Sequence, residues 1–116
     1  MNNEMNSRTK ALGLDIIRLI DLFPNKPSSW VITKQILRSS TSVGANYRAA
    51  FRARSKADFI NKLKIVEEEA DETLFWLALI EDAGLIQAEN LQALKKEATE
   101  ILAIVVSSIK TTRGKN

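Results

Sequence analysis

The feature that most constrains this chain is a series of four stretches in which apolar residues recur every three or four positions. That spacing gathers apolar side chains on one side of an α-helix, and no part of the chain alternates strictly as a half-buried β-strand does. We expect helices over residues 7–23, 30–52, 56–83 and 88–111. Because the links between them are short, consecutive helices must run in opposite directions. The sequence therefore predicts an all-α, antiparallel up-down-up-down four-helix bundle.

Several residues at the expected helix ends have recognisable capping chemistry. Ser28 or Ser29 can cap the start of the second helix, since a serine oxygen accepts a bond from the first free backbone N–H groups. Ser55 and Asp58 have the spacing of a capping box before the third helix. Gly84 suits the left-handed conformation that ends many helices. These signals separate the four helices.

The apolar residues of the four expected helices can form one core. Its 116 residues, of which 45% are apolar, suffice for one continuous core. The stripes expected to form that core are Leu12, Ile16, Leu19, Ile20 and Phe23; Ile32, Ile36, Val43, Tyr47 and Ala50; Phe59, Leu63, Val66, Ala70, Leu74 and Leu77; and Leu91, Leu94, Ala98, Ile101, Leu102, Val105 and Ile109. We therefore treat residues 1–116 as a single domain.

The composition argues against catalysis. The chain has no histidine and no cysteine, so it lacks the usual general base near neutral pH, the usual zinc ligands and any disulfide. A di-iron site in a helical bundle would need Glu-x-x-His pairs, which this chain cannot supply. We expect no enzymatic activity, no metal and no cofactor. The absence of cysteine and of a long apolar run indicates a cytoplasmic protein that does not enter membranes.

The second expected helix contains the run QILRSSTSVGANYRAA, residues 35–50. Further segments follow it in order, namely SKADF at 55–59, KL at 62–63, EEADET at 68–73 and WL at 76–77. Together these segments resemble a bacterial four-helix-bundle family, over about residues 12–109. That family includes the proteins encoded in intervening sequences of 23S ribosomal RNA genes. The resemblance implies a homo-oligomeric ring, typically a pentamer, and an accessory protein of diversity-generating retroelements that is similar in fold binds nucleic acid.

The third helix has a second apolar face beside its core stripe. Ile65, Trp76 and Leu79 lie on this face at helical spacing, and Glu69 and Glu72 point into the same sector. An exposed apolar area of this kind usually marks a contact with another protein chain. We interpret it as a subunit interface, with the alternative that Trp76 lies over a groove within its own bundle.

The same helix is strongly acidic. Residues 65–82 contain seven acidic residues and no basic one, and several acids are like-charged neighbours four residues apart. A Mg²⁺ or Ca²⁺ site is the less favoured interpretation, because consecutive helical residues point in different directions. We expect solvated acids or ion pairs, with the nearest cations in the chain as partners. These are Arg48, Arg52, Arg54, Lys62 and Lys64.

The run of small residues over 39–45 is unusual within a helix, because Gly44 alone costs about 1 kcal/mol relative to alanine. Close packing of two helices offsets that cost and is the favoured explanation. A ligand groove lined by backbone is the alternative.

Antiparallel topology gathers basic residues at one end of the bundle. Nine basic and two acidic residues fall there, namely Arg8, Lys10, Arg48, Arg52, Arg54, Lys56, Lys110, Arg113 and Lys115 against Glu4 and Asp58. In a ring, these ends would form one basic face suited to a phosphate backbone. The candidate nucleic-acid-binding residues are Arg48, Arg52, Arg54, Lys56, Lys110 and Arg113. Our leading hypothesis is a ring-forming bundle that binds RNA or DNA weakly and with little sequence preference. The alternative is a protein-interaction or scaffold module that does not bind nucleic acid.

Overall fold

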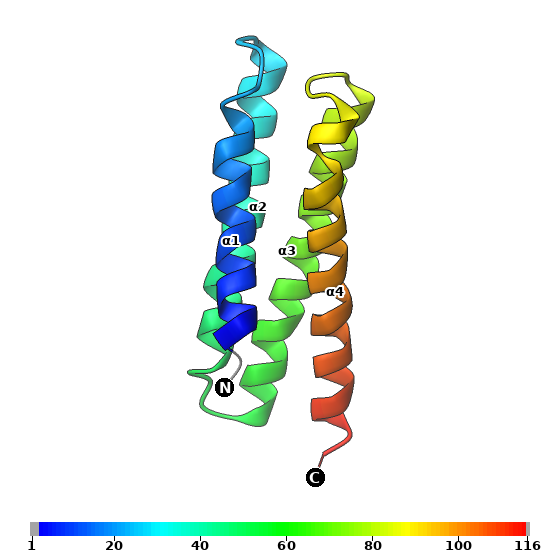
Figure 1. The fold of residues 1–116 in the computed structure, drawn as a ribbon. Coiled ribbons are helices and arrows are strands. Elements are labelled where there is room, and N and C mark those ends of the chain that lie inside the picture. Colours follow the sequence, from blue (N-terminus) through cyan, green and yellow to red (C-terminus); the bar gives the residue numbers. More distant parts are fainter. Residues whose placement is uncertain (1–2, 116) are drawn as a thin grey trace.

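The computed structural model describes residues 3–115 and consists of four long helices. They are α1 (Asn3–Ile20), α2 (Pro27–Ala50), α3 (Lys56–Asp82) and α4 (Gln92–Arg113), with a short 3₁₀ turn, η1 (Ala88–Asn90), before the last. Successive helices run in opposite directions (Figure 1), and the described residues contain no strand. The predicted all-α four-helix bundle is confirmed.

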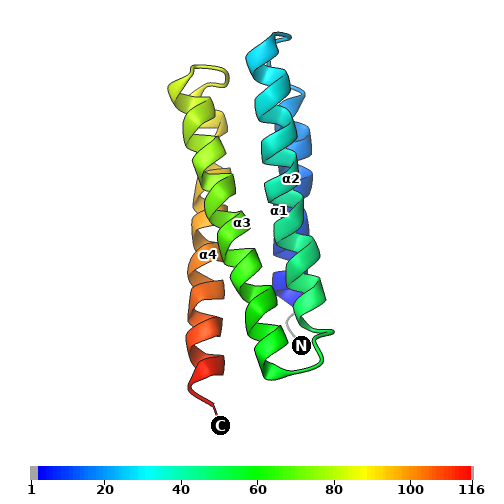
Figure 2. The same ribbon diagram turned by 180° about the vertical axis from the view of Figure 1, so that it is seen from behind.

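The molecule is an elongated bundle of 51 × 21 × 20 Å. Helix α2 packs extensively against both α1 and α3, and α3 packs against α4, whereas α1 and α4 contact each other much less. Figure 2 shows α2 and α3 from their own side. The α2–α3 turn, the start of α1 and the end of α4 lie toward one end of the bundle, and the other two turns lie at the opposite end (Figure 1).

The apolar stripes predicted from the sequence form the core. Most of their residues are buried, and a few at the edges are partly buried, namely Ile20, Phe23, Phe59, Leu74 and Leu102. The core also takes in apolar residues outside the predicted stripes, namely Met5, Ile80, Leu85 and Ile86. One cluster thus extends along all four helices.

Helix α3 begins and ends as its sequence predicts. Ser55 Oγ accepts a hydrogen bond of 3.0 Å from the backbone N–H of Asp58. Gly84 has a φ of +69° and donates its N–H to the carbonyl oxygen of Glu81 at 3.0 Å. Both caps depend on residues within one turn, which explains why local sequence locates them.

The other helix ends differ from prediction. Helix α2 begins at Pro27, because proline at the first helical position has no N–H to leave unpaired. Lys26 occupies the N-cap position without a side-chain bond, so the predicted cap by Ser28 or Ser29 is wrong. The side chain of Ser29 instead faces the interior.

The bounds of the first and last helices also differ from those predicted. Helix α1 covers 3–20 rather than 7–23, because the chain enters a turn after Ile20. The predicted fourth helix, 88–111, is divided into η1 and α4, which meet at Leu91. Leu91 itself is fully buried.

The small residues of α2 lie where its neighbours approach most closely. A Cβ atom on Gly44 would stand 3.1 Å from the carbonyl oxygen of Thr9, so α1 and α2 cross nearly backbone to backbone. On the side facing α3, the hydroxyl oxygens of Ser39 and Thr73 are hydrogen-bonded at 3.0 Å in the interior. The predicted close packing is confirmed.

Candidate functional site

Exposed cations of three segments meet at the end of the bundle that carries the α2–α3 turn. Lys56, at the start of α3, donates a hydrogen bond from Nζ to the carbonyl oxygen of Lys115, beyond the end of α4. This contact joins the turn to the C-terminal segment. We call the following exposed residues the basic end: Arg52, Arg54, Lys56, Lys110, Arg113 and Lys115.

No member of the basic end forms an ion pair with a carboxylate of residues 3–115. The nearby Asp58 accepts instead a weak bond of 3.4 Å from the backbone N–H of Arg54. Because carboxylates do not neutralise these cations, their charge remains available to an anionic partner.

The structure places Arg8 away from the basic end. Its Nε and Nη2 atoms donate to both carboxylate oxygens of Glu97, at 2.8 and 2.6 Å, and Nη2 also donates to Glu100 at 2.9 Å. Hydrogen bonding to Glu97 raises the pKa of Arg8. The bond from Arg8 in turn lowers the pKa of Glu97 below its ordinary 4.5. Arg8 therefore joins α1 to α4 and is not a free cation.

The acids of α3 also find partners, although not the predicted ones. Arg38 of α2 pairs with Glu69 at 3.0 Å and with Glu72. The indole Nε1 of Trp76 donates to Glu72 at 3.0 Å and, together with Arg38, lowers the pKa of that carboxyl group. Lys95 of α4 pairs with Glu81. These cations replace the predicted partners, which form no ion pair with described acids of α3; the predicted set was Arg48, Arg52, Arg54, Lys62 and Lys64.

The predicted interface residues of α3 are largely turned toward the bundle. Ile65, Glu69, Glu72 and Trp76 are partly buried, and Trp76 packs against the core. Leu79 alone among the five is exposed, with 37% of its surface accessible. The arrangement of Trp76 matches the alternative that it lies within its own bundle.

The exposed surface of α3 is offset by one residue from the face that the sequence predicts as the interface. Phe75 is 57% exposed, and its ring and that of Trp76 form a T-shaped contact with the centroids 4.9 Å apart. The sequence analysis assigns Trp76 rather than Phe75 to the exposed face. The two residues are adjacent, so an error of one residue in the orientation of the helix is enough to exchange their positions. We call the exposed set Glu68, Asp71, Phe75 and Leu79 the α3 outer face.

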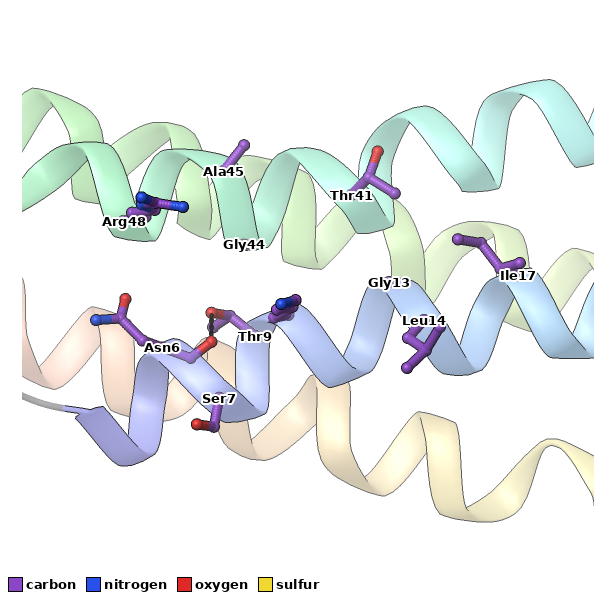
Figure 3. Close-up of a pocket in the computed structure, with 11 residues that line it drawn as sticks. Asn6, Ser7, Thr9, Gly13, Leu14, Ile17, Thr41, Gly44, Ala45 and Arg48 are labelled. Atoms are coloured by element: carbon purple, nitrogen blue, oxygen red, sulfur yellow. Dashed lines mark hydrogen bonds between the residues drawn. The ribbon is translucent and has the colours of Figure 1, made fainter.

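A groove of about 640 Å³ runs along the outer side of the α1–α2 crossing. Its floor is formed where Gly13 and Gly44 let the two helices approach, and Leu14 and Ile17 line its wall (Figure 3). Both apolar side chains are more than 40% exposed. Arg48 lines the groove as well, so it lies at the border of the basic end rather than within it. We define the α1–α2 groove by the residues Lys10, Gly13, Leu14, Ile17, Gly44 and Arg48.

Two features are absent from the part of the chain that the structure describes. Residues 3–115 include no group of three or more acidic side chains arranged to hold a metal ion. None of the described helices is both long enough and apolar enough to cross a membrane.

The family follows from comparison with known proteins. The family model of the 23S rRNA-intervening sequence proteins matches residues 1–107. The chain belongs to this family. The chain is also similar to a protein of known crystal structure from Bacteroides thetaiotaomicron, described as a protein of unknown function from the S23 ribosomal protein family, with 40% sequence identity and a TM-score of 0.85. The match covers 91% of this chain and 98% of that one. A search of curated proteins found no match, and neither description of the family names an enzymatic activity.

Proposed function

We propose that this family member is a non-enzymatic, ring-forming bundle that binds RNA or DNA weakly through its basic end. The observation that carries the proposal is the contrast in charge pairing. Arg8, Arg38 and Lys95 are paired with acids of neighbouring helices, whereas every cation of the basic end lacks a carboxylate partner among residues 3–115. Unpaired cations on one exposed surface are the arrangement that neutralises phosphates.

Ring formation would bring the basic ends of several copies onto one surface. In a cyclic assembly all copies point the same way, so their basic ends share one face of the ring. Exposed Phe75 and Leu79 support such an assembly, because contiguous apolar residues on a helix surface favour a contact with another chain. One aromatic ring, Phe51, lies among these cations with 40% of its surface exposed, and it packs against Tyr47 and Phe59. A single ring offers no platform for stacking successive bases, so the proposed binding has little preference for base sequence.

Fluorescence anisotropy of labelled single-stranded RNA and duplex DNA, titrated at several salt concentrations, tests the binding. We expect affinity to fall linearly with log salt. Replacing Arg52 and Arg54 by alanine should weaken binding and flatten that slope by roughly 0.7 to 0.9 for each phosphate that is no longer neutralised. The matched control is Lys34→Ala with Lys96→Ala, which removes the same charge from exposed positions elsewhere on α2 and α4.

Equal losses of affinity in the two double variants would show that net charge, rather than the basic end, governs binding. No measurable binding by the wild-type protein even at low salt would reject nucleic-acid binding. The protein-interaction module would then be the better hypothesis.

A further inference from the structure

Two surfaces of the bundle, the α1–α2 groove and the α3 outer face, have no apolar cover within the described chain. We propose that the groove of one copy receives the α3 outer face of a neighbouring copy that points in the same direction. This inference rests on the ring formation proposed above and names the surfaces that meet.

The two surfaces are complementary in charge, and both carry exposed apolar residues. The groove carries exposed Lys10 and Arg48, and neither forms an ion pair with a described acid. The α3 outer face carries exposed Glu68 and Asp71, and both are likewise unpaired among residues 3–115. Both surfaces also carry exposed apolar side chains. Leu14 and Ile17 line the groove, and Phe75 lies on the α3 outer face. Opposite potentials on two such surfaces favour their association and fix its orientation.

The order of these groups along the helices selects a parallel arrangement. Helices α1 and α3 both run from the basic end toward the opposite end (Figure 1). On α1, Lys10 precedes Leu14, and on α3, Asp71 precedes Phe75 by the same four residues. Parallel copies therefore place cation against acid and apolar group against apolar group. An antiparallel pair would place the cations of the groove against Leu79.

The two surfaces also lie at nearly the same height in the bundle. Gly44 is level with Thr9 of α1, and Ser39, five residues away on α2, is level with Thr73 of α3. Five helical residues rise ~7.5 Å, and α1 and α2 run in opposite directions, so position 14 of α1 is level with Ser39 and therefore with Thr73. Phe75 lies two residues further along α3, about 3 Å away along the axis. A rotation about an axis parallel to the bundle, with almost no translation, is then sufficient to bring the surfaces together. Such an operation closes a ring when its rotation is a whole fraction of a full turn, whereas a large translation would generate a filament.

Charge exchange between the surfaces tests the pairing. The groove variant is Lys10→Glu with Arg48→Glu, and the face variant is Glu68→Lys with Asp71→Lys. Light scattering should show the wild type as an oligomer and each variant alone as a monomer, because like charges then meet at every contact. A mixture of the two variants should associate again, since every contact between a groove variant and a face variant joins opposite charges. A ring with an odd number of copies cannot alternate the two variants, so the mixture should form open or even-numbered assemblies. Lys34→Glu with Lys96→Glu, exposed and outside both surfaces, is the control and should remain oligomeric.

The outcomes separate this inference from ring formation itself. A monomeric wild type would overturn both. An oligomeric wild type whose groove and face variants stay oligomeric would overturn the pairing and leave ring formation standing. Circular dichroism and thermal melts check that each variant folds. If a charge-reversed variant does not fold, neutral replacements (Lys10→Gln with Arg48→Gln, and Glu68→Gln with Asp71→Asn) should weaken association severalfold, and unchanged association would contradict the pairing.

Discussion

The middle of the bundle and its basic end use the same residue types for different purposes. In the middle, Arg8 joins α1 to α4 through Glu97, and Arg38 joins α2 to α3 through Glu69. At the basic end, the turn and the C-terminal segment meet through a backbone carbonyl, and the cations form no ion pair with a described carboxylate. Arg8 and Arg38 thus tie neighbouring helices together through ion pairs, while the cations of the basic end contribute no ion pair to that alignment. The difference supports the proposal that the end serves binding rather than stability.

The largest effect should come from the core of the middle region. Leu63 is 1% exposed and lies on the inner face of α3. Leu63→Ala should lower the free energy of unfolding by roughly 2 to 5 kcal/mol, because truncating a buried leucine leaves a cavity. Urea denaturation measures the loss. Leu22→Ala, at a 59% exposed leucine in the α1–α2 turn, is the control and should change stability by less than about 0.5 kcal/mol. Similar losses in both variants would contradict the assigned phase of α3.

The next largest effect should come from the pair that joins α1 to α4. Arg8 is 25% exposed and binds Glu97 with two parallel hydrogen bonds. Arg8→Ala should cost about 1 kcal/mol, toward the upper limit for partly exposed pairs. Arg18→Ala, at an exposed pair with Asp15 at 3.6 Å, should cost less. If both variants have the same stability, the alignment of α1 with α4 does not depend on Arg8.

The cost of losing Arg8 should also depend on pH. Arg8 holds the pKa of Glu97 below 4.5, so the folded protein binds fewer protons at this site than the unfolded chain. The stabilisation is therefore complete above pH 4.5 and is lost as the pH falls through the lowered pKa. Denaturation at pH 7 and at about pH 3 should show the difference between wild type and Arg8→Ala shrinking in acid. A difference that is independent of pH would mean that Glu97 is not the partner that matters.

The smallest effect on stability should come from the basic end. Arg52→Ala with Arg54→Ala should change the free energy of unfolding by less than about 0.5 kcal/mol, as expected for exposed residues without partners. Thermal melts of the variant used for nucleic-acid binding provide the measurement. A loss as large as that of Arg8→Ala would remove the contrast between the two regions.

Local signals made much of the fold predictable. Helix α3 was predicted within one residue at both ends, because the cap by Ser55 and the left-handed Gly84 act within a single turn. The serine cap of α2 was wrong because Pro27 begins that helix and Ser29 turns inward. A single sequence does not reveal which of two adjacent capping candidates tertiary packing will bury.

The candidate site was less predictable, because it depends on how the helices align. Arg38 was missed as the partner of α3 since its approach to Glu69 requires the register of α2 against α3. Arg8 was assigned to the basic end because the sequence does not show that α1 starts beside the middle of α4. Phe75 and Trp76 are adjacent in the chain, and only packing decides which of them is exposed.

An even number of antiparallel helices returns the chain to the end from which it started, as Figure 1 shows for α1 and α4. A segment that follows α4 would consequently leave the bundle beside Arg113 of the basic end, and in a ring all such segments would crowd onto one side. An affinity tag placed after α4 would therefore interfere with measurements at the cationic surface. The α1–α2 and α3–α4 turns, at the far end, are the places where a probe would leave that surface open.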